Sequence, residues 1–253
     1  NLLAAPLRFT WWRSAIDNDG MKLWTGQDEK PLGKWQAAGI HETSHTLIEP
    51  PAWGDDSLRV GWRLSTPQLD GAGTFRQVFK LVDGGLLVSN ELVCAESLPD
   101  LPRVGTQFAL QEGFKRVVYC GNGPQENYRD RNAAAWVERF ETTVSDMYVP
   151  YIMPQECGNR FEVRWFALHD TAQDRMVCIQ ALDAPLECKA LHFSDRDLYA
   201  AKHTFDLEPC AETWVSIDAA QRGVGTKSCG PDTLPQYKLP PQTYRWSFLI
   251  CLG

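Results

Sequence analysis

The feature that most constrains the fold is the repeated alternation of apolar and polar residues over short segments. Clear examples lie at 58–64, 75–81, 86–93 and 244–250. Successive side chains of a strand point to opposite faces of the sheet, so this pattern, bounded by Gly, Asp and Pro, predicts half-buried β-strands. Weaker patterns predict further strands at 103–110, 114–120, 160–168, 175–182, 186–193 and 213–218. Asp83-Gly84-Gly85 is typical of a hairpin turn between two of the strands.

Helical signals are few and short. The segment 33–42 predicts one short helix, and Ser194 followed by Asp197 resembles a capping pattern in front of another. Neither helix can carry a core. No Pro/Gly/Ser-rich linker, charge block or internal repeat divides the 253 residues. We therefore expect an all-β fold with a single domain over 1–253, in which two large antiparallel sheets are stacked.

The charge balance narrows the possible partners. The formal net charge is -7, and Lys and Arg are not clustered, which argues against a nucleic-acid surface. No run approaches the ~18 apolar residues that a membrane-spanning helix needs. We expect neither nucleic acid nor membrane as a partner, and we expect neutral or weakly charged ligands.

The cysteines favour a reducing environment. All 8 are scattered without a C-x-x-C pair or a short Cys/His spacing, which argues against a structural zinc site. A chain of this size does not need disulfides, and cysteines in strand-like segments suit small buried positions. We expect free thiols, no metal in this chain and a cytoplasmic location.

Two segments concentrate charged, amide and aromatic side chains. They are 123–131, with the sequence Gly-Pro-Gln-Glu-Asn-Tyr-Arg-Asp-Arg, and 145–156. Together with 13–19, 35–39, 223–232 and the alternating tail 237–251, they occur in one order along nearly the whole chain. In this order they resemble the C-terminal domain, also called the small chain or domain 5, of LacZ-type bacterial β-galactosidases of glycoside hydrolase family 2.

The resemblance implies a β-supersandwich of the galactose-mutarotase-like class, here lacking the strand hairpin that opens the domain in the family. It also implies that the two catalytic glutamates lie in a preceding (β/α)8 barrel, because no residue of this chain matches them. The expected partners are that barrel, the other domains, a galactoside substrate and further copies of the parent enzyme. No cofactor is expected here, since the family's Mg²⁺ and Na⁺ are often bound by other domains. The isolated fragment is expected to be inactive.

Paired acids alone do not indicate catalysis in this chain. Retaining cleavage of a glycosidic bond needs two carboxyl groups about 5 Å apart. Suitable spacings occur at Asp17 with Asp19, Glu126 with Asp130 and Asp195 with Asp197. Turns and solvated surfaces of a β domain offer many such pairs. We therefore expect no catalytic residue here.

Two groups of polar residues are interpreted as structural. The first, Arg13, Asp17, Asn18 and Asp19, suits a turn with a nearby charge partner, and an incomplete calcium loop is the alternative. The second suits a hydrogen-bond network that braces a long connection, with binding of sugar hydroxyls as the alternative. It consists of Glu126, Asn127, Tyr128, Asp130 and Arg131.

The loop at 225–232 is the best candidate for contact with substrate. In the family that it resembles, this loop reaches into the active site of the barrel, and some members place there a Trp that stacks on the sugar. Cys229 occupies the closest matching position, which implies altered acceptor or aglycone binding. The candidate contacts are Lys227, Ser228, Cys229 and Asp232. A tight Gly/Pro loop with a small buried thiol is the structural alternative.

Two other functions remain open. A stand-alone carbohydrate-binding or mutarotase-like domain is favoured by the aromatic and His content, and a mutarotase needs a His acid and a carboxylate base. The 5 histidines match no such motif. A purely structural interaction module is the other alternative.

Overall fold

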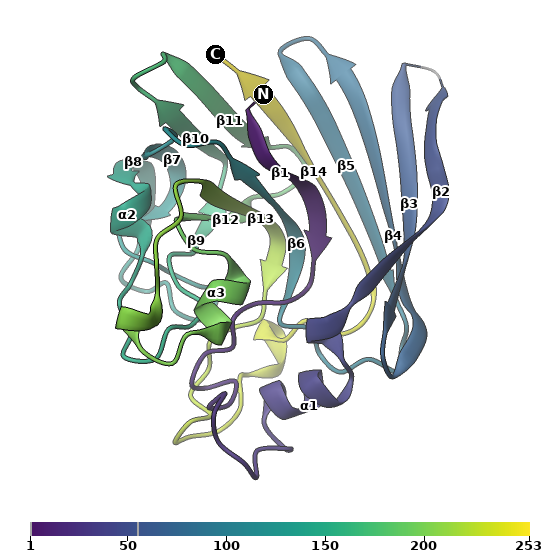
Figure 1. Ribbon diagram of the computed structural model, residues 1–253, viewed down its shortest axis with the longest axis vertical. Helices are drawn as coiled ribbons and strands as arrows, with labels where there is room; N and C mark the ends of the chain where they lie inside the picture. The colour runs from purple at the N-terminus through teal and green to yellow at the C-terminus, as the bar shows by residue number, and fades with distance from the viewer. Residues whose placement is uncertain (1, 55) are drawn as a thin grey trace.

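The computed structural model describes residues 2–54 and 56–253, which form two antiparallel sheets. The five-stranded sheet has the order β1-β6-β13-β12-β9, and the nine-stranded sheet has the order β2-β3-β4-β5-β14-β11-β10-β7-β8. Figure 1 shows the nine-stranded sheet extending past β1 toward β2, β3 and β4. This arrangement confirms the predicted all-β class with two stacked sheets.

The strands have the following bounds. The five-stranded sheet contains β1 (Leu3–Thr10), β6 (Arg103–Leu110), β13 (Thr213–Gln221), β12 (Leu186–Leu191) and β9 (Arg160–Val163). The nine-stranded sheet contains β2 (Ser44–Gly54), β3 (Ser57–Thr66), β4 (Leu69–Val82), β5 (Gly85–Cys94), β14 (Thr243–Leu252), β11 (Arg175–Ala181), β10 (Trp165–Asp170), β7 (Arg116–Gly123) and β8 (Trp136–Thr143). The predicted hairpin turn joins β4 to β5, with Val82 opposite Gly85.

The predicted strand at 160–168 is wrong as a single element. The chain leaves the five-stranded sheet after β9 and enters the nine-stranded sheet at β10. Glu162 adopts a positive φ of 55°, and Arg164 between the strands donates its N–H to Cys120 O at 2.7 Å. This break lets one apolar segment contribute to both layers.

Among the described residues, three short α-helices lie outside the sheets. They are α1 (Pro31–Ala37), α2 (Val144–Met147) and α3 (Asp195–Ala200). The helix predicted at 33–42 is divided, because Gly39 with a φ of 69° separates α1 from a 3-10 turn at Ile40–Glu42. Ser194 and Asp197 form the predicted capping box of α3. None of the helices in the described residues is both long and apolar enough to span a membrane.

Aromatic rings fill the space between the sheets. Phe75 of β4 is central, with its ring centroid 4.6 Å from that of Phe9 and 6.0 Å from that of Trp246. All three are buried, as are Trp11 and Trp35. This core holds the two sheets together.

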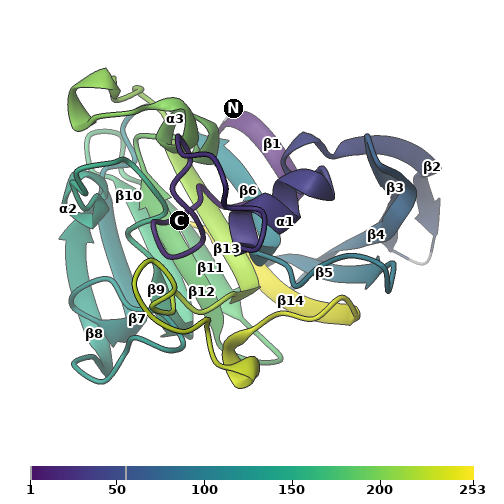
Figure 2. The same cartoon turned by 90° about the horizontal axis from the view of Figure 1, so that it is seen from below.

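The long connections gather at one end of the molecule. Figures 1 and 2 show that end, where the segment before α1 and the segment before β14 lie together.

Candidate functional site

Three distant segments meet at the loop end, and two side chains hold them together. Asn18 donates from Nδ2 to Gly225 O at 2.7 Å and accepts at Oδ1 from the Ser228 hydroxyl at 2.6 Å. Asp130 accepts the backbone N–H groups of Val224 and Gly225 at 2.9 and 2.8 Å. Segments 13–19, 123–131 and 223–232 therefore form one unit.

A buried ion pair lies beneath this unit. Arg13 donates from Nη2 and Nε to the two carboxylate oxygens of Asp19 at 2.7 and 3.1 Å, and both side chains are 0% exposed. Asp19 also accepts the Ile16 N–H at 3.2 Å. The Arg13 guanidinium donates a further hydrogen bond to Arg222 O. These contacts join the N-terminal turn to the end of β13, and they place Arg13 and Asp19 inside the fold.

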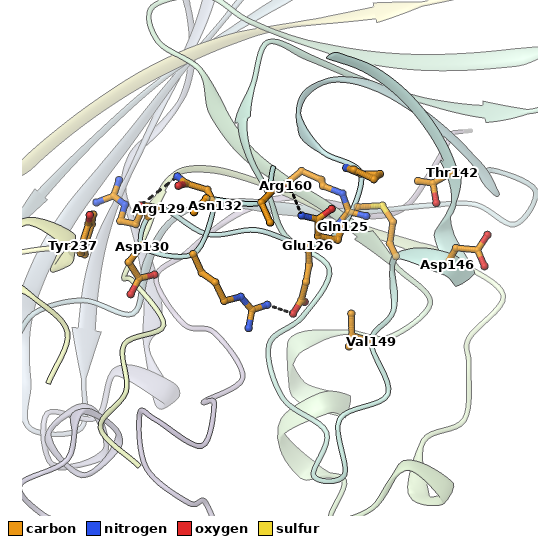
Figure 3. Close-up of a pocket in the computed structure, with 15 residues that line it drawn as sticks. Gln125, Glu126, Arg129, Asp130, Asn132, Thr142, Asp146, Val149, Arg160 and Tyr237 are labelled. Atoms are coloured by element: carbon orange, nitrogen blue, oxygen red, sulfur yellow. Dashed lines mark hydrogen bonds and ion pairs between the residues drawn. The ribbon is translucent and has the colours of Figure 1, made fainter. Parts of the chain in front are cut away.

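Glu126 is the centre of a second group of polar contacts. Its Oε1 accepts hydrogen bonds from Arg131 and from the Tyr151 hydroxyl, and its Oε2 accepts the Gly158 N–H at 2.9 Å. Figure 3 shows the carboxylate of Glu126 facing a guanidinium group. One carboxylate thereby joins the loop between β7 and β8 to the segment between α2 and β9.

Asn127 is buried and bonds in three directions. Its Nδ2 donates to Asn122 O at 3.0 Å and to Gln125 O at 2.8 Å, and its Oδ1 accepts the Phe161 N–H at 2.9 Å. Its backbone oxygen accepts from Asn159 Nδ2 at 2.9 Å. The geometry is that of a brace between β7 and β9.

Tyr128 differs from its neighbours because its hydroxyl is unsatisfied. The side chain is 2% exposed and packs with Ile16 and Val224 in a small apolar cluster separate from the main core. Within the described part of the chain, its Oη has no hydrogen-bond partner. Burial raises the pKa of this phenol well above its ordinary value, and the nearby carboxylates of Glu126 and Glu156 raise it further.

The predicted substrate-contact residues do not share one environment. Cys229 is exposed, so the alternative of a buried thiol in this loop is wrong. Ser228 is exposed but is held by Asn18. Lys227 lies 3.7 Å from Asp232. Thr226 to Pro231 form a turn, in which the Gly230 N–H donates to Thr226 O at 2.7 Å. The tip of the loop therefore presents Cys229 outward.

Asp232 is committed to ion pairs at the base of the loop. Its carboxylate accepts from Arg222 Nη2 at 2.8 Å and from Lys238 Nζ at 2.7 Å. Against the opposing effect of burial, these cations hold the pKa of Asp232 well below its ordinary value. The carboxylate of Asp232 thus stabilises the loop.

The fold gives separate partners to the two carboxylates of each acid pair that the sequence spacing suggested. Asp19 bonds to Arg13, whereas Asp17 is exposed beside Gln155, whose Oε1 accepts the Asp17 N–H at 3.0 Å. Asp195 is buried against Arg103 and Lys189, each at 2.7 Å, whereas Asp197 caps α3. In each pair the two carboxylates serve different partners, as do Glu126 and Asp130 above.

Two pockets open at this end. The larger, about 910 Å³, is lined by Gln125, Glu126, Arg129, Asp130, Asp146 and Arg160 among others, and Figure 3 shows these side chains around it. The smaller, about 250 Å³, lies where the three segments meet, with Arg131 lining both pockets. Tyr151, Gln155 and Glu156 line the smaller pocket although the sequence did not single them out. Their place within 145–156, the segment rich in polar residues, was the available signal.

Four buried acids lie near the five-stranded sheet and were not predicted as a group. Glu156 and Asp195 pair with Lys189, and Asp195 and Asp218 pair with Arg103. Glu187 accepts hydrogen bonds from Asn159 Nδ2 and from the Gln221 N–H. Burial raises the pKa of Asp218 to about 7, although Arg103 opposes this shift.

The described residues include no group of three or more His, Cys, Asp or Glu placed to hold a metal ion. All eight cysteines are free: three are buried, four are half-buried and one is exposed.

Comparisons with known proteins give the family. The family model described as "Beta galactosidase small chain" matches residues 1–250. A β-galactosidase of Streptococcus thermophilus is 32% identical over 225 residues, covering 87% of this chain and 21% of that protein. A β-galactosidase of Priestia megaterium is 30% identical over 243 residues, covering 94% and 22%. The chain therefore spans about a fifth of the length of these relatives.

Solved structures with a similar arrangement are more distant in sequence. A galactose mutarotase-like protein from Clostridium acetobutylicum is 11% identical with a TM-score of 0.48, covering 98% of this chain and 79% of that one. A galactose mutarotase-like protein from Lactobacillus casei is 13% identical with a TM-score of 0.46, covering 83% and 73%. The family match over nearly the whole sequence is decisive: the chain belongs to the β-galactosidase small chain family.

Proposed function

We propose that this chain is the C-terminal domain of a LacZ-type β-galactosidase of glycoside hydrolase family 2. The parent enzyme hydrolyses terminal β-D-galactosides with retention of configuration, and its catalytic glutamates lie in a barrel outside this chain. Family membership over residues 1–250 and the length of the relatives support this proposal. The same proposal assigns three further properties to the parent enzyme. They are Mg²⁺ and Na⁺ as cofactors, assembly into oligomers and a cytoplasmic location.

The observation that carries the proposed role is the fixed loop at 225–232. Asn18 and Asp130 anchor its first residues, and the pairs of Asp232 anchor its last, so the exposed tip with Cys229 projects from a rigid base. A rigid, exposed loop can form one wall of a neighbouring active site at low entropic cost. We assign it to the entrance of the barrel's active site.

The acids of this chain are poor candidates for the hydrolysis itself. A retaining mechanism needs one carboxylate free to attack and a second free to exchange a proton, about 5 Å apart. Asp19, Glu126, Asp130 and Asp232 each accept several hydrogen bonds from cations or backbone N–H groups in the described structure. Such bonds lower the nucleophilicity of a carboxylate, which favours a supporting role.

Activity assays test the proposal directly. The isolated chain is expected to release no nitrophenol from o-nitrophenyl β-D-galactoside, whereas the full-length protein that contains it turns this substrate over. Robust turnover by the isolated chain would place catalysis here and contradict the assignment. Inactivity of the full-length protein toward every β-galactoside tested, with tight binding of free galactose by the chain, would instead support the stand-alone carbohydrate-binding alternative.

The role of the loop has its own test. Cys229→Trp in the full-length protein adds an aromatic face at the exposed tip and is expected to change KM for galactosides in proportion to the size of their aglycone. Cys251→Ser, at the other end of the molecule in β14, is the matched control. Equal KM values for the unmodified protein and both variants would contradict the placement of this loop at the entrance of the active site.

A further inference from the structure

We propose that the 910 Å³ pocket, here called the arginine pocket, binds a carboxylate group that pairs with the buried guanidinium of Arg160. Such a site is separate from the proposed galactoside contact of the loop at 225–232. Two sources can supply the same chemistry. One is a soluble carboxylic acid, and the other is an Asp or Glu side chain of another domain of the parent enzyme.

Arg160 is the exception among the buried basic side chains of the described residues. These side chains are Arg13, Arg103, Arg160, Lys189 and Arg222. Each of the other four has a carboxylate oxygen at 2.5–2.7 Å, whereas Arg160 forms no ion pair in the described part of the chain. Burying a charge is costly unless the charge is paired. The fold thus leaves one buried positive charge without its anion.

Neutral oxygens hold the guanidinium of Arg160, and one of its nitrogens stays free. Its Nε donates to the Tyr119 hydroxyl at 2.9 Å, and its Nη1 donates to Gly158 O and Asn159 O at 3.0 and 3.3 Å. A cation–π contact with the Tyr119 ring, 5.6 Å away, is weaker than a close ion pair. None of these contacts supplies a negative charge.

The free nitrogen of Arg160 is open to the arginine pocket. Nη2 makes no hydrogen bond within the described residues, and it is not among the enclosed polar atoms that lack a partner. Arg160 lines the pocket, and Figure 3 shows it among the side chains around the pocket. An anion that enters the pocket can therefore accept a charge-assisted hydrogen bond from Nη2, which is roughly twice as strong as a neutral one.

The acids that line the arginine pocket are already committed to other partners. Glu126 pairs with Arg131, Asp130 accepts two backbone N–H groups, and Asp146 accepts a hydroxyl at the start of α2. They therefore leave Arg160 uncompensated, but their charge disfavours a multivalent anion. A single free positive charge beside three acids is best matched by one monovalent carboxylate.

A second cation reinforces the attraction for an anion. Arg129 also lines the pocket, and its closest carboxylate oxygen belongs to Glu187 at 3.8 Å, which is long for an ion pair. The positive charge of Arg129 is therefore only weakly compensated. Arg129 and Arg160 together give one part of the lining an excess of positive charge.

The volume shows that the carboxylate belongs to a larger body. Small-molecule sites occupy roughly 300–1,000 Å³, and a pocket of about 910 Å³ lies within this range. It can accept a ring-sized acid or the tip of a protein loop. The chain spans about a fifth of the length of its relatives, so other domains could supply such a loop.

A crystal structure of the full-length protein separates the two sources. An Asp or Glu of another domain within hydrogen-bond distance of Arg160 Nη2 would support the inference and identify the partner. If the pocket is open, crystals soaked with sodium benzoate should show the benzoate carboxylate bonded to Nη2. Only water or an uncharged side chain at Nη2, with and without benzoate, would overturn the inference.

Calorimetric titration of the full-length protein with benzoate and with its neutral analogue benzamide gives the energetic test. We expect benzoate to bind more tightly, because only the carboxylate balances the charge of Arg160. Arg160→Gln should weaken benzoate binding by about 10- to 100-fold and leave benzamide binding unchanged. A purely structural role of Arg160 would weaken both ligands equally and would refute the inference. Arg164→Gln is the matched control, because Arg164 is exposed and does not line the pocket.

Two further variants keep the test decisive. If Arg160→Gln does not fold, Asn132→Asp adds a negative charge to the lining and should weaken benzoate binding by about 2- to 5-fold, with benzamide unaffected. If an acid of another domain occupies the pocket, its change to the amide should open the site to benzoate. Equal affinities for benzoate and benzamide in these variants would contradict a carboxylate site.

Discussion

Asn18 and Ser228 are 210 residues apart in the chain, yet the Ser228 hydroxyl donates to Asn18 Oδ1 at 2.6 Å. The backbone N–H of Ser228 donates to the same oxygen at 3.1 Å, and Asn18 Nδ2 bonds to Gly225 O. The amide side chain of Asn18 is thus hydrogen-bonded to both Gly225 and Ser228 of the loop. The shape of the proposed entrance wall depends on a turn near the start of the chain.

Asn18→Ala is expected to release this loop while the sheets remain folded. The three lost hydrogen bonds are partly exposed, so the free energy of unfolding should fall by only about 1–2 kcal/mol. Hydrogen exchange measured by mass spectrometry should show faster exchange over 225–232 and unchanged exchange in β6. Asn132→Ala is the control, because Asn132 makes one long 3.4 Å bond to Arg129 O. Unchanged exchange in the loop would contradict the anchoring role.

Arg13→Met is expected to be far more costly than removal of an exposed ion pair. It removes the bidentate partner of the buried carboxylate of Asp19 and leaves only Arg222, 3.8 Å away, as a nearby cation. Breaking a buried pair costs about 3–5 kcal/mol. Arg63→Met removes a pair with Asp70 at 3.6 Å in which both side chains are largely exposed, so it should cost less than about 1 kcal/mol. Urea unfolding of both variants tests this contrast, and similar midpoints would argue against it.

The sequence predicts the interior strands well and the edge strands poorly. The three strands without a prediction, β1, β2 and β8, all lie at sheet edges. Edge strands tolerate Pro, as at Pro6, Pro50 and Pro51, and they expose both faces to solvent, so alternation is weak. The burial pattern of β8 shows this directly, since all of its residues are exposed or half-buried. A strand shows a clear alternation of apolar and polar residues only where one of its faces is buried. These edge strands lack such a face.

The candidate site was predictable in its residues but not in its contacts. Composition and the family resemblance point to segments 13–19, 123–131 and 223–232, and the fold brings all three together. The different contacts of Asp17 and Asp19 were not predictable, because they depend on which of the two side chains faces Arg13. Glu156 was equally hidden, since its partner Lys189 lies 33 residues away on β12.

The stability of the folded chain should fall between pH 4 and pH 7 through Asp218. Burial raises its pKa from 3.8 to about 7, so in this window the folded chain keeps a proton that the unfolded chain has lost. Stability from this group is therefore complete at low pH and decreases as the pH rises, with a slope approaching about 1.4 kcal/mol per pH unit. Above pH 7 the contribution no longer changes.

Comparison with Asp218→Asn isolates this effect from other titrating groups. The difference in unfolding free energy between the native chain and the variant should change steadily from pH 5 to pH 7 and then level off. Asp70→Asn, at an exposed position, controls for the loss of one negative charge. A difference that is constant with pH would show that Asp218 is ionised throughout, held so by Arg103 at 2.5 Å.

Thiol labelling should separate Cys229 from the other cysteines. Cys229 is exposed at the loop tip, whereas burial raises the pKa of Cys157 to about 12 and that of Cys188 well above its ordinary value. Since the thiolate is the reactive form, the native chain should show one fast phase with a disulfide reagent, and mass spectrometry should locate that adduct on Cys229. In Cys229→Ser the fast phase should disappear, while the slow phases keep their rates. A fast phase that persists in the variant would mean that another thiol is accessible and that the loop covers Cys229.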